Sequence, residues 1–474
     1  MTANSTTTSP ACPTTSGECA DLNASLRWPV LSLFFGAAFW LIVSSLCALI
    51  ASIKCHAPGI FADCEWFAYG RLHAVHLNAL VYGFAAQGAL GVTLALLART
   101  GQTRLALPGG ALFAAKLWNL GVLVGVVSIF AGHNTGIQFL EFSQAGAVIL
   151  FIAYLILALA GLLTFAKRNV CSDVSQSFLV TALFWFPWIY ATATALLGCM
   201  PVRGVTQAVI AWWFTNNFLF VWLGLIALGA LFHFAPQYAG RPLYSRQLAL
   251  FALLVLIGFA SWSGVPAGAP VPAWIPALST FGAIVTLTAV VAVVVNLKHT
   301  MAGCRKQDCD AAGNFFCKSV PGFIVYGVGS AVASISGFAH VLDFTWFSAA
   351  LNYFLLYGFV AMVLLGAIYR LSPQLIGVDY CCVKPVKIHF WFALLGTLFL
   401  AGSLALAGIR QGRLLNDTAV DFNAVSKGTQ MFFRMSTVGD LLILLGALTL
   451  AFNFAGLLWG MCKQCCGKTS EVKQ

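Results

Sequence analysis

Long apolar stretches separated by short polar segments run along almost the whole chain. Twelve of them are close to the roughly 20 residues that a helix needs to cross a bilayer. Apolar residues follow one another without the polar alternation of barrel strands, so we expect helices. The pattern predicts an all-α integral membrane protein. The expected spans are residues 28–52, 77–98, 107–132, 143–166, 175–200, 205–235, 247–264, 274–297, 319–338, 345–369, 388–408 and 437–461.

Polar segments flank this membrane region at both ends. Residues 1–27 are rich in Thr and Ser and lack the apolar core of a secretory signal, so we predict a flexible polar tail. Residues 462–474 form a short Cys- and Lys-rich tail. Residues 28–461 are then one twelve-helix membrane domain. Composition agrees, because only 8% of the 474 residues are charged, against about 25% in soluble domains.

The net charge of +11 raises the question of nucleic acid as a partner. The basic residues are concentrated in the loops on one side of the membrane, which favours an explanation from membrane orientation. The two tails and the alternate loops on their side hold 17 of the 25 Lys and Arg, and the opposite side holds 7. Cytoplasmic loops carry such an excess, so both termini are predicted to be cytoplasmic. No nucleic-acid partner is expected.

The stretch from Gly70 to Asn78 at the mouth of the second span is the main candidate for chemistry. His73 and His76 are three residues apart and share a helix face. An ionisable residue at the entrance of a membrane helix is costly without a partner, and imidazole is the commonest axial ligand of haem iron. The alternative is that both histidines lie in the membrane interface and contact water or headgroups.

Two charged residues stand out elsewhere in the membrane region. Lys116 lies near the middle of the third expected span, where a buried charge needs a partner or water. Glu141 follows that span, in a short connection. We expect Glu141 to be a solvated loop acid, although a carboxylate there is also able to bind a cation.

The fifteen cysteines allow several interpretations. Cys55 and Cys64 share the first loop on the side opposite the tails and are candidates for a disulfide in an oxidising compartment. The run Cys462-Lys-Gln-Cys465-Cys466 looks like half of a zinc or cluster site. Free thiols, or palmitoylation near the membrane, are the alternative. The chain contains no Cys-X-X-Cys-His, so it cannot attach haem c itself.

Several short motifs occur along the chain in the same order as in a known protein family. The chain resembles subunit I of the cbb3-type cytochrome c oxidases, in the haem–copper oxidase superfamily, from about Phe67 to the twelfth span. Twelve helices are the core of that family. The resemblance implies a haem-binding protein of aerobic respiration and electron transport, in the bacterial inner membrane, with partners such as c-type cytochromes. The motifs that carry it are Gly70-Arg71-Leu72, His76-Leu77-Asn78, Phe186-Pro187-Trp188-Ile189-Tyr190-Ala191, Trp212-Trp213 with Asn217, Arg241-Pro242-Leu243-Tyr244-Ser245, Gly408-Ile409-Arg410-Gln411-Gly412 and Arg434-Met435.

The resemblance also assigns site residues. His76 matches the family's axial ligand of a low-spin haem b, which makes haem b the expected cofactor. Arg434 matches an arginine near the haem propionates, and a guanidinium facing a carboxylate is chemically sensible. The other interpretation of Arg434, and of Arg410 and Arg413 in the same region, is contact with lipid headgroups.

The remaining metal ligands of the family are missing. Asn216 stands where the family has a copper-ligating histidine in the sixth span, and Pro266 and Ala267 stand at its adjacent histidine pair. Ala260 replaces the tyrosine that cross-links to a copper ligand. The tenth span should carry His-X-His, but residues 343–353 contain no histidine in any register. No catalytic residue and no copper ligand are therefore assigned.

Three functions remain open at this point. The first is a subunit I-like component of a respiratory complex that binds at most one haem b and lacks a working oxygen-reduction centre. For that haem, His340 just before the tenth span is a candidate substitute for the second ligand. The second is an active terminal oxidase with unrecognised ligands. The third is a transporter, or a haem- or copper-handling scaffold, on the same helices. A metal site without ligands cannot be assembled by its scaffold alone, which favours the first.

Overall fold

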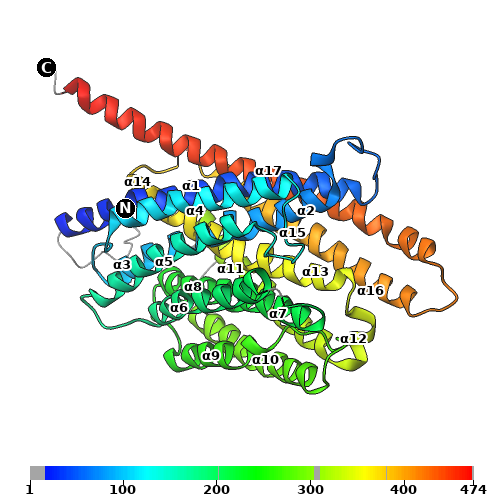
Figure 1. Cartoon of the computed structure of the whole chain (residues 1–474). Coiled ribbons are helices and arrows are strands. Elements are labelled where there is room, and N and C mark those ends of the chain that lie inside the picture. The colour runs from blue at the N-terminus through cyan, green and yellow to red at the C-terminus, as the bar shows by residue number, and fades with distance from the viewer. Residues whose placement is uncertain (1–15, 201, 304–309, 381, 472–474) are drawn as a thin grey trace.

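The computed structural model describes residues 16–200, 202–303, 310–380 and 382–471, and these form a bundle of long helices (Figure 1). Several spans join an α-helix to a π-helical segment, labelled η. The helices are α1 (Ser16–Lys54), α2 (Tyr69–Asn78), η2 (Ala79–Ala86), α3 (Gln87–Thr100), α4 (Pro108–Phe130), α5 (Gln144–Ala166), α6 (Val174–Thr194), η3 (Ala195–Cys199), α7 (Val205–Asn216), η4 (Asn217–Leu223), α8 (Gly224–Ala239), α9 (Arg246–Gly258), α10 (Trp274–Thr300), α11 (Ala311–Ser334), α12 (Ser336–Leu342), α13 (Trp346–Tyr353), η6 (Phe354–Ala361), α14 (Met362–Ile376), α15 (Lys384–Thr397), η7 (Leu398–Gly402), α16 (Ser403–Leu415) and α17 (Phe422–Glu471), with the 3-10 turns η1 (Glu65–Phe67) and η5 (Ala260–Trp262).

The expectation of an all-α membrane protein is confirmed. Within the described residues, eleven helices are long and apolar enough to cross a membrane, and Arg246–Trp262 is a shorter apolar helix between them. The first and last helices run past the expected spans, because α1 begins at Ser16 and α17 ends at Glu471. Large apolar side chains such as Phe113, Leu254 and Trp391 are exposed on the outside. In a membrane these side chains face lipid.

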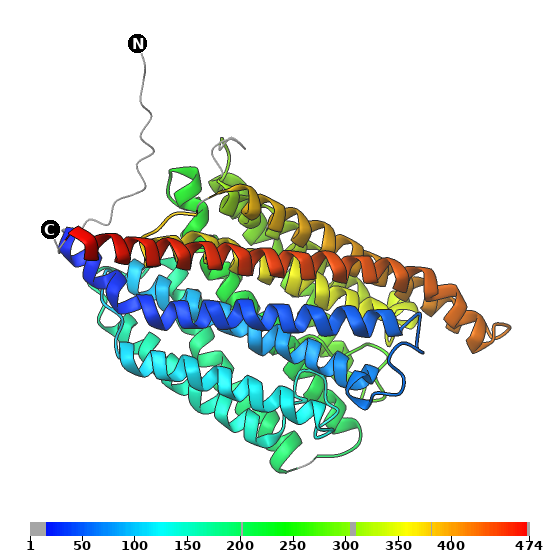
Figure 2. The ribbon, with the colours of Figure 1, turned by 90° about the horizontal axis from the view of Figure 1, so that it is seen from above.

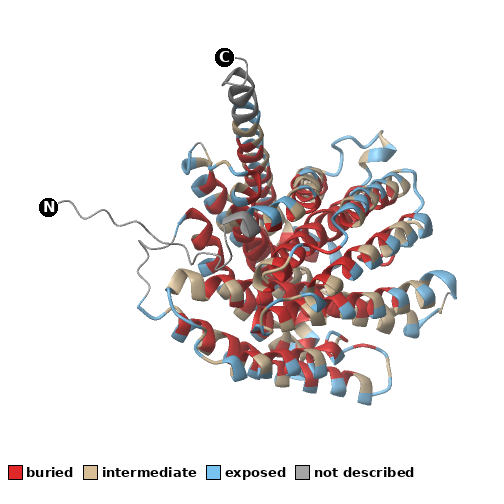
Figure 3. Cartoon of the chain, turned by 90° about the vertical axis from the view of Figure 1, so that its left-hand side faces the viewer, coloured by how far each residue is buried: buried red, intermediate tan, exposed pale blue. Residues whose placement is uncertain are grey.

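Three spans form the centre of the bundle. They are α2–η2–α3, α7–η4–α8 and α13–η6–α14, and they contact one another. In the 18-residue apolar stretch of each span, 89–100% of the residues are buried, whereas the outer helices keep one exposed face (Figure 3). Each of the three changes from α- to π-helix at its middle, directly after Asn78, Asn216 or Tyr353. π-helical turns are frequent at functional sites, so these three positions direct attention to the adjacent side chains.

The outer helices surround this centre and bring the chain ends together. Helix α1 packs against α17, and the two run side by side (Figure 2). The first and last described residues therefore lie at the same end of the bundle, as an even number of crossings requires. The loops that follow α1, α4, α6 and α16 lie at the opposite end, here called the loop end. Which membrane face the loop end meets stays a prediction.

Candidate functional site

His76 is buried on α2 and both of its ring nitrogens are hydrogen-bonded. It is 2% exposed. Its Nδ1 lies 3.0 Å from Ser44 Oγ and 3.2 Å from the Ser44 carbonyl oxygen, while Ser44 Oγ donates to the His76 carbonyl at 2.9 Å. Nε2 lies 3.1 Å from the Tyr353 hydroxyl. These geometries assign the proton to Nδ1, so Nε2 accepts from Tyr353.

A small cavity lies beside this pair, between α1, α2, α13, α16 and α17. We call it the histidine cavity. Its volume is about 40 Å³, which accommodates roughly three water molecules. His73 also borders it, half-buried and stacked on Tyr69 with ring centroids 5.3 Å apart. The polar residues that line it are Ser52, Tyr69, His73, His76, Tyr353, Ser436 and Asp440.

Asp440 is the residue of this cavity that the sequence analysis missed. It lies on α17 and is only 5% exposed. The signal was available, because a carboxylate inside an apolar span is expensive and marks a site by default. Asp440 falls in the expected span 437–461, directly after Gly439, whose lack of a side chain lets α17 approach the backbone of Leu400.

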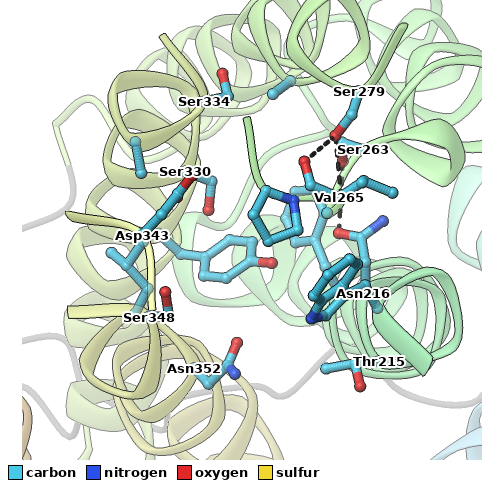
Figure 4. Close-up of a pocket in the computed structure, with 18 of the residues that line it drawn as sticks. Thr215, Asn216, Ser263, Val265, Ser279, Ser330, Ser334, Asp343, Ser348 and Asn352 are labelled. Atoms are coloured by element: carbon cyan, nitrogen blue, oxygen red, sulfur yellow. Dashed lines mark hydrogen bonds between the residues drawn. The ribbon is translucent and has the colours of Figure 1, made fainter. Parts of the chain in front are cut away.

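A larger cavity lies between α7, α10, α11 and α13. We call it the polar cavity. Its volume is about 270 Å³. Figure 4 shows Thr215, Asn216 and Ser263 on one side and Ser330, Asp343 and Asn352 on the other, facing one another across the space. Its lining is dominated by hydroxyls, amides and aromatic rings.

Two asparagines hold one wall of the polar cavity. Asn216 Nδ2 donates to the Ala260 carbonyl at 2.8 Å, and the neighbouring Asn217 Nδ2 donates to the Ser261 carbonyl at 2.9 Å. The two amides thus hold the η5 turn, which follows α9, against the junction of α7 and η4. Gly264 makes this approach possible, since it has φ +103° and a Cβ there would lie 2.6 Å from the Asn216 Cβ.

Comparisons with known proteins agree with this architecture. The family model "Cytochrome C and Quinol oxidase polypeptide I" matches residues 29–442. The chain belongs to that family. The cbb3-type cytochrome c oxidase subunit CcoN1 of Stutzerimonas stutzeri is 25% identical, over 87% of this chain and 91% of the relative. A cytochrome c oxidase subunit 1 of Rhodobacter capsulatus is also 25% identical, over 88% and 82%. A haem–copper terminal oxidase dimer solved by cryo-electron microscopy shares the fold, with TM-score 0.73, 14% identity, and coverage of 94% of this chain and 84% of that one.

Tyr353 is the residue of the tenth span that faces His76 in the structure. On the expectation that His76 matches the family's haem ligand, one position of the expected His-X-His falls on Tyr353. The other falls on Leu351, which lines the polar cavity. A leucine cannot ligate a metal.

The histidine cavity does not fit a haem in this structure. An iron between His76 Nε2 and Tyr353 would hold the two atoms about 4 Å apart, since each bond to a metal is about 2 Å. The observed separation is 3.1 Å and the atoms are hydrogen-bonded. The cavity of about 40 Å³ is also far smaller than a porphyrin. The assignment of haem b to His76 remains a prediction that this geometry does not support.

The polar cavity offers no donor set for copper or for a haem iron. The residues that the resemblance matches to the family's copper ligands include Asn216 and Pro266, which line this cavity, and the Asn216 amide is already bonded to backbone. Amide groups are poor copper ligands beside imidazole. Within the described part of the chain, no group of three or more His, Cys, Asp and Glu side chains could hold a metal ion.

Arg434, the other predicted haem contact, lies outside both cavities. It is exposed on α17, and its guanidinium charge, after the larger effect of burial, lowers the pKa of His56. His56 Nε2 lies 3.1 Å from Thr437 Oγ1, one turn along the same helix. Arg434 therefore lies at the loop end of the bundle, near His56. Its role toward haem propionates stays a prediction.

Two expectations about charged residues are wrong. Lys116 is exposed on the outer face of α4, eight residues from the helix start, so it needs no buried partner. Its flexible chain can reach the membrane interface. Glu141 is 6% exposed rather than solvated, and it accepts a hydrogen bond of 2.6 Å from Asn78 Nδ2. Burial raises the pKa of Glu141 to about 7.

The remaining histidines and cysteines form no metal site in the described residues. His340, the candidate substitute ligand, is exposed on α12 and lines neither cavity. His389 bonds through Nδ1 to the Tyr369 hydroxyl at 2.7 Å, near the opposite end. Cys55 and Cys64 are free thiols. Cys304, Cys309 and Cys381 lie outside the described residues, as do the side chains of Cys465 and Cys466.

Proposed function

We propose that this chain is a cbb3-like subunit I component of a membrane respiratory complex that has no oxygen-reducing haem–copper centre of its own. One observation carries the proposal: the family's ligand positions hold Asn216, Pro266, Leu351 and Tyr353. Their side chains pack, bond to backbone or bond to His76. Metal affinity depends on deprotonated donors in a defined number and geometry, and these positions do not supply them.

The same proposal assigns His76 a structural role. Its ring joins α1 to α13 through Ser44 and Tyr353, which are distant in sequence. A buried polar group that loses its hydrogen bond costs about 1–3 kcal/mol. The imidazole therefore contributes to helix packing at the position where the family binds a low-spin haem.

Partners follow from the family. Members of the oxidase subunit I family work inside membrane respiratory complexes, and this chain cannot attach haem c itself. A membrane-anchored c-type cytochrome is therefore the expected partner. The test is purification of the tagged full-length chain from its native membrane under mild detergent, followed by haem staining and identification of co-purified subunits. Isolation of the chain alone after chemical cross-linking would contradict the respiratory-complex role.

The absence of an oxygen-reduction centre is tested on the purified protein. Haem b and copper are quantified per chain, a reduced-minus-oxidised spectrum is recorded for wild type and His76→Ala, and oxygen consumption is measured with an artificial electron donor. We expect less than one tenth of a haem b or copper per chain and no oxygen consumption. A stoichiometric b-type signal that disappears in His76→Ala would overturn the structural role of His76. Stoichiometric copper with oxygen uptake would overturn the proposal altogether.

A further inference from the structure

The polar cavity has the dimensions of a ligand site. It begins at the loop end, where Asp343 and Phe344 lie, and it reaches Thr286 about halfway along α10. Its volume of about 270 Å³ is close to the lower end of the roughly 300–1,000 Å³ of small-molecule sites. A small solute can therefore enter from the loop end and reach the middle of the membrane.

The charge that lines the polar cavity is negative. Asp343 is its single carboxylate, and no Lys, Arg or His is among the described residues that line the cavity. Asp343 Oδ2 accepts the Gly268 N–H at 2.9 Å, which fixes the carboxylate at the rim. An anion would meet no compensating charge, whereas a cation would.

Aromatic rings stand beside this carboxylate. Trp212 and Phe344 face each other with ring centroids 6.2 Å apart, and Tyr326 lines the same space. Aromatic faces attract cations, and ammonium groups are recognised by such rings. Phe344 has φ +59°, a conformation that a bulky residue seldom adopts and that concentrates at functional sites. This strained backbone places the Phe344 ring beside Asp343 and Trp212.

Deeper in the cavity, polar side chains have unused hydrogen-bonding capacity. Within the described residues, no protein group hydrogen-bonds to the side chains of Thr215, Ser348 or Asn352, all of which line the space. Buried polar groups in proteins are normally hydrogen-bonded, as those of Asn216 and Ser263 are. Free hydroxyls and an amide suit a ligand with its own polar groups.

From this arrangement we propose that the polar cavity binds a small organic ammonium ion that also carries a hydroxyl or similar polar group. The cationic end lies against Asp343, Trp212 and Phe344, and the polar end lies toward Thr215 and Asn352. This proposal does not depend on assembly into a respiratory complex. It would also explain why the cavity has kept its volume while the histidine cavity has closed.

The test compares choline with 3,3-dimethylbutan-1-ol, a neutral compound of the same shape. Binding to the purified full-length chain is measured by isothermal titration calorimetry in detergent, with haem content recorded in parallel. We expect choline to bind at least about tenfold more tightly than the neutral compound, because its charge is attracted both by the Asp343 carboxylate and by the aromatic rings. Equal affinities, or no binding of choline to folded wild-type protein, would overturn the proposal.

Variants localise the site. Asp343→Asn keeps the acceptor for Gly268 and should weaken choline binding about tenfold without changing the neutral compound. Asp417→Asn removes an exposed carboxylate at the same end of the bundle and should leave binding unchanged. Trp212→Leu serves as a second variant, with folding of each variant checked by thermal unfolding. Choline binding that persists unchanged in both Asp343→Asn and Trp212→Leu would place the ligand elsewhere and overturn the assignment.

Discussion

The two cavities occupy related places in one bundle but differ in how their polar groups are used. In the histidine cavity His76 bonds Ser44 and Tyr353 directly, and the space left is about 40 Å³. In the polar cavity about 270 Å³ is lined by hydroxyls and amides, several of which have no hydrogen-bond partner among the described residues. The difference teaches that one helix bundle can close one site by side-chain pairing and keep another open.

The physical reason lies in the length and polarity of the side chains that border the two cavities. Tyr353 is long enough to reach His76, so the pair satisfies itself and the helices close. Leu351 has no polar group to pair, and the residues around it are short ones such as Ser348. Short side chains on α13 and α7 cannot meet across the gap. An open cavity remains, whose polar groups are then available to water or a ligand.

The largest expected effect comes from the wall of the polar cavity. Gly264→Ala combines a positive φ, which costs an L-residue about 1–2 kcal/mol, with overpacking against Asn216, which costs about 1–3 kcal/mol. We expect the free energy of unfolding in detergent to fall by roughly 2–5 kcal/mol. Denaturant titration followed by circular dichroism measures it.

Gly136→Ala provides the matched control. Gly136 lies at the same end with φ +70°, but nothing lies within 4 Å of the position of its Cβ. Its cost should be limited to the backbone term of about 1–2 kcal/mol. Equal losses for the two variants would show that the contact with Asn216 does not support the cavity wall.

The next effect concerns the loop between α4 and α5, which bonds to Asn78 and reaches the polar cavity. Glu141 bonds Asn78, two residues from His76, and Gln138 of the same segment lines the polar cavity. Burial raises the pKa of Glu141 from 4.5 to about 7. The folded state then binds the proton more tightly than the unfolded state, so stability falls as pH rises from about 4.5 to about 7. The loss amounts to roughly 3 kcal/mol.

Glu141→Gln should remove this loss, because glutamine keeps an acceptor for Asn78 and does not ionise. We expect the variant to be more stable than wild type at pH 8 and similar at pH 4.5, measured by denaturant titration at both values. The control is Glu65→Gln, whose parent carboxylate is exposed beside Arg71. A wild-type advantage at pH 8 would reverse the sign and contradict the burial of a protonatable Glu141.

The sequence predicted the helices well because each span is decided by its own apolar residues. Local patterns predict the even number of crossings, the positions of the spans and the position of His76 at a helix entrance. Which side of a helix faces inward is a tertiary property. Lys116 and Glu141 were placed wrongly for this reason, since neither the outward face of α4 nor the fold of the loop over Asn78 is visible in the local pattern.

The site itself was predictable only in part. The lack of a histidine in residues 343–353 showed that ligands were missing, but the register was ambiguous, so the sequence could not show that Tyr353 meets His76. That contact joins residues 277 positions apart. The polar cavity was invisible for the same reason, because its hydroxyls come from four helices. Asp440, by contrast, stood out as an acid in an apolar span and could have been found.

A third prediction tests whether the histidine cavity is held closed by its tyrosine. Tyr353→Phe leaves Nε2 of His76 buried without a donor, so we expect a loss of about 1–3 kcal/mol in the free energy of unfolding. Tyr190→Phe is the control, because Tyr190 is equally buried but its hydroxyl makes only a 3.4 Å contact with the Ala147 carbonyl. A neutral Tyr353→Phe would mean that the hydrogen bond does not close the cavity.

The smallest expected effect on stability comes from removing one serine hydroxyl beside each cavity, and the two losses should differ. Ser44→Ala removes a hydroxyl that lies 3.0 Å from His76 Nδ1 and donates to the His76 carbonyl at 2.9 Å, so we expect a loss of about 1–2 kcal/mol. Ser348→Ala removes a hydroxyl at the polar cavity that has no protein partner among the described residues, and the change should stay within about 0.5 kcal/mol. Thermal and denaturant unfolding of both variants, without added ligand, measure the difference. Equal losses would mean that the polar cavity is as tightly paired as the histidine cavity, which would remove the distinction between a closed site and an open one.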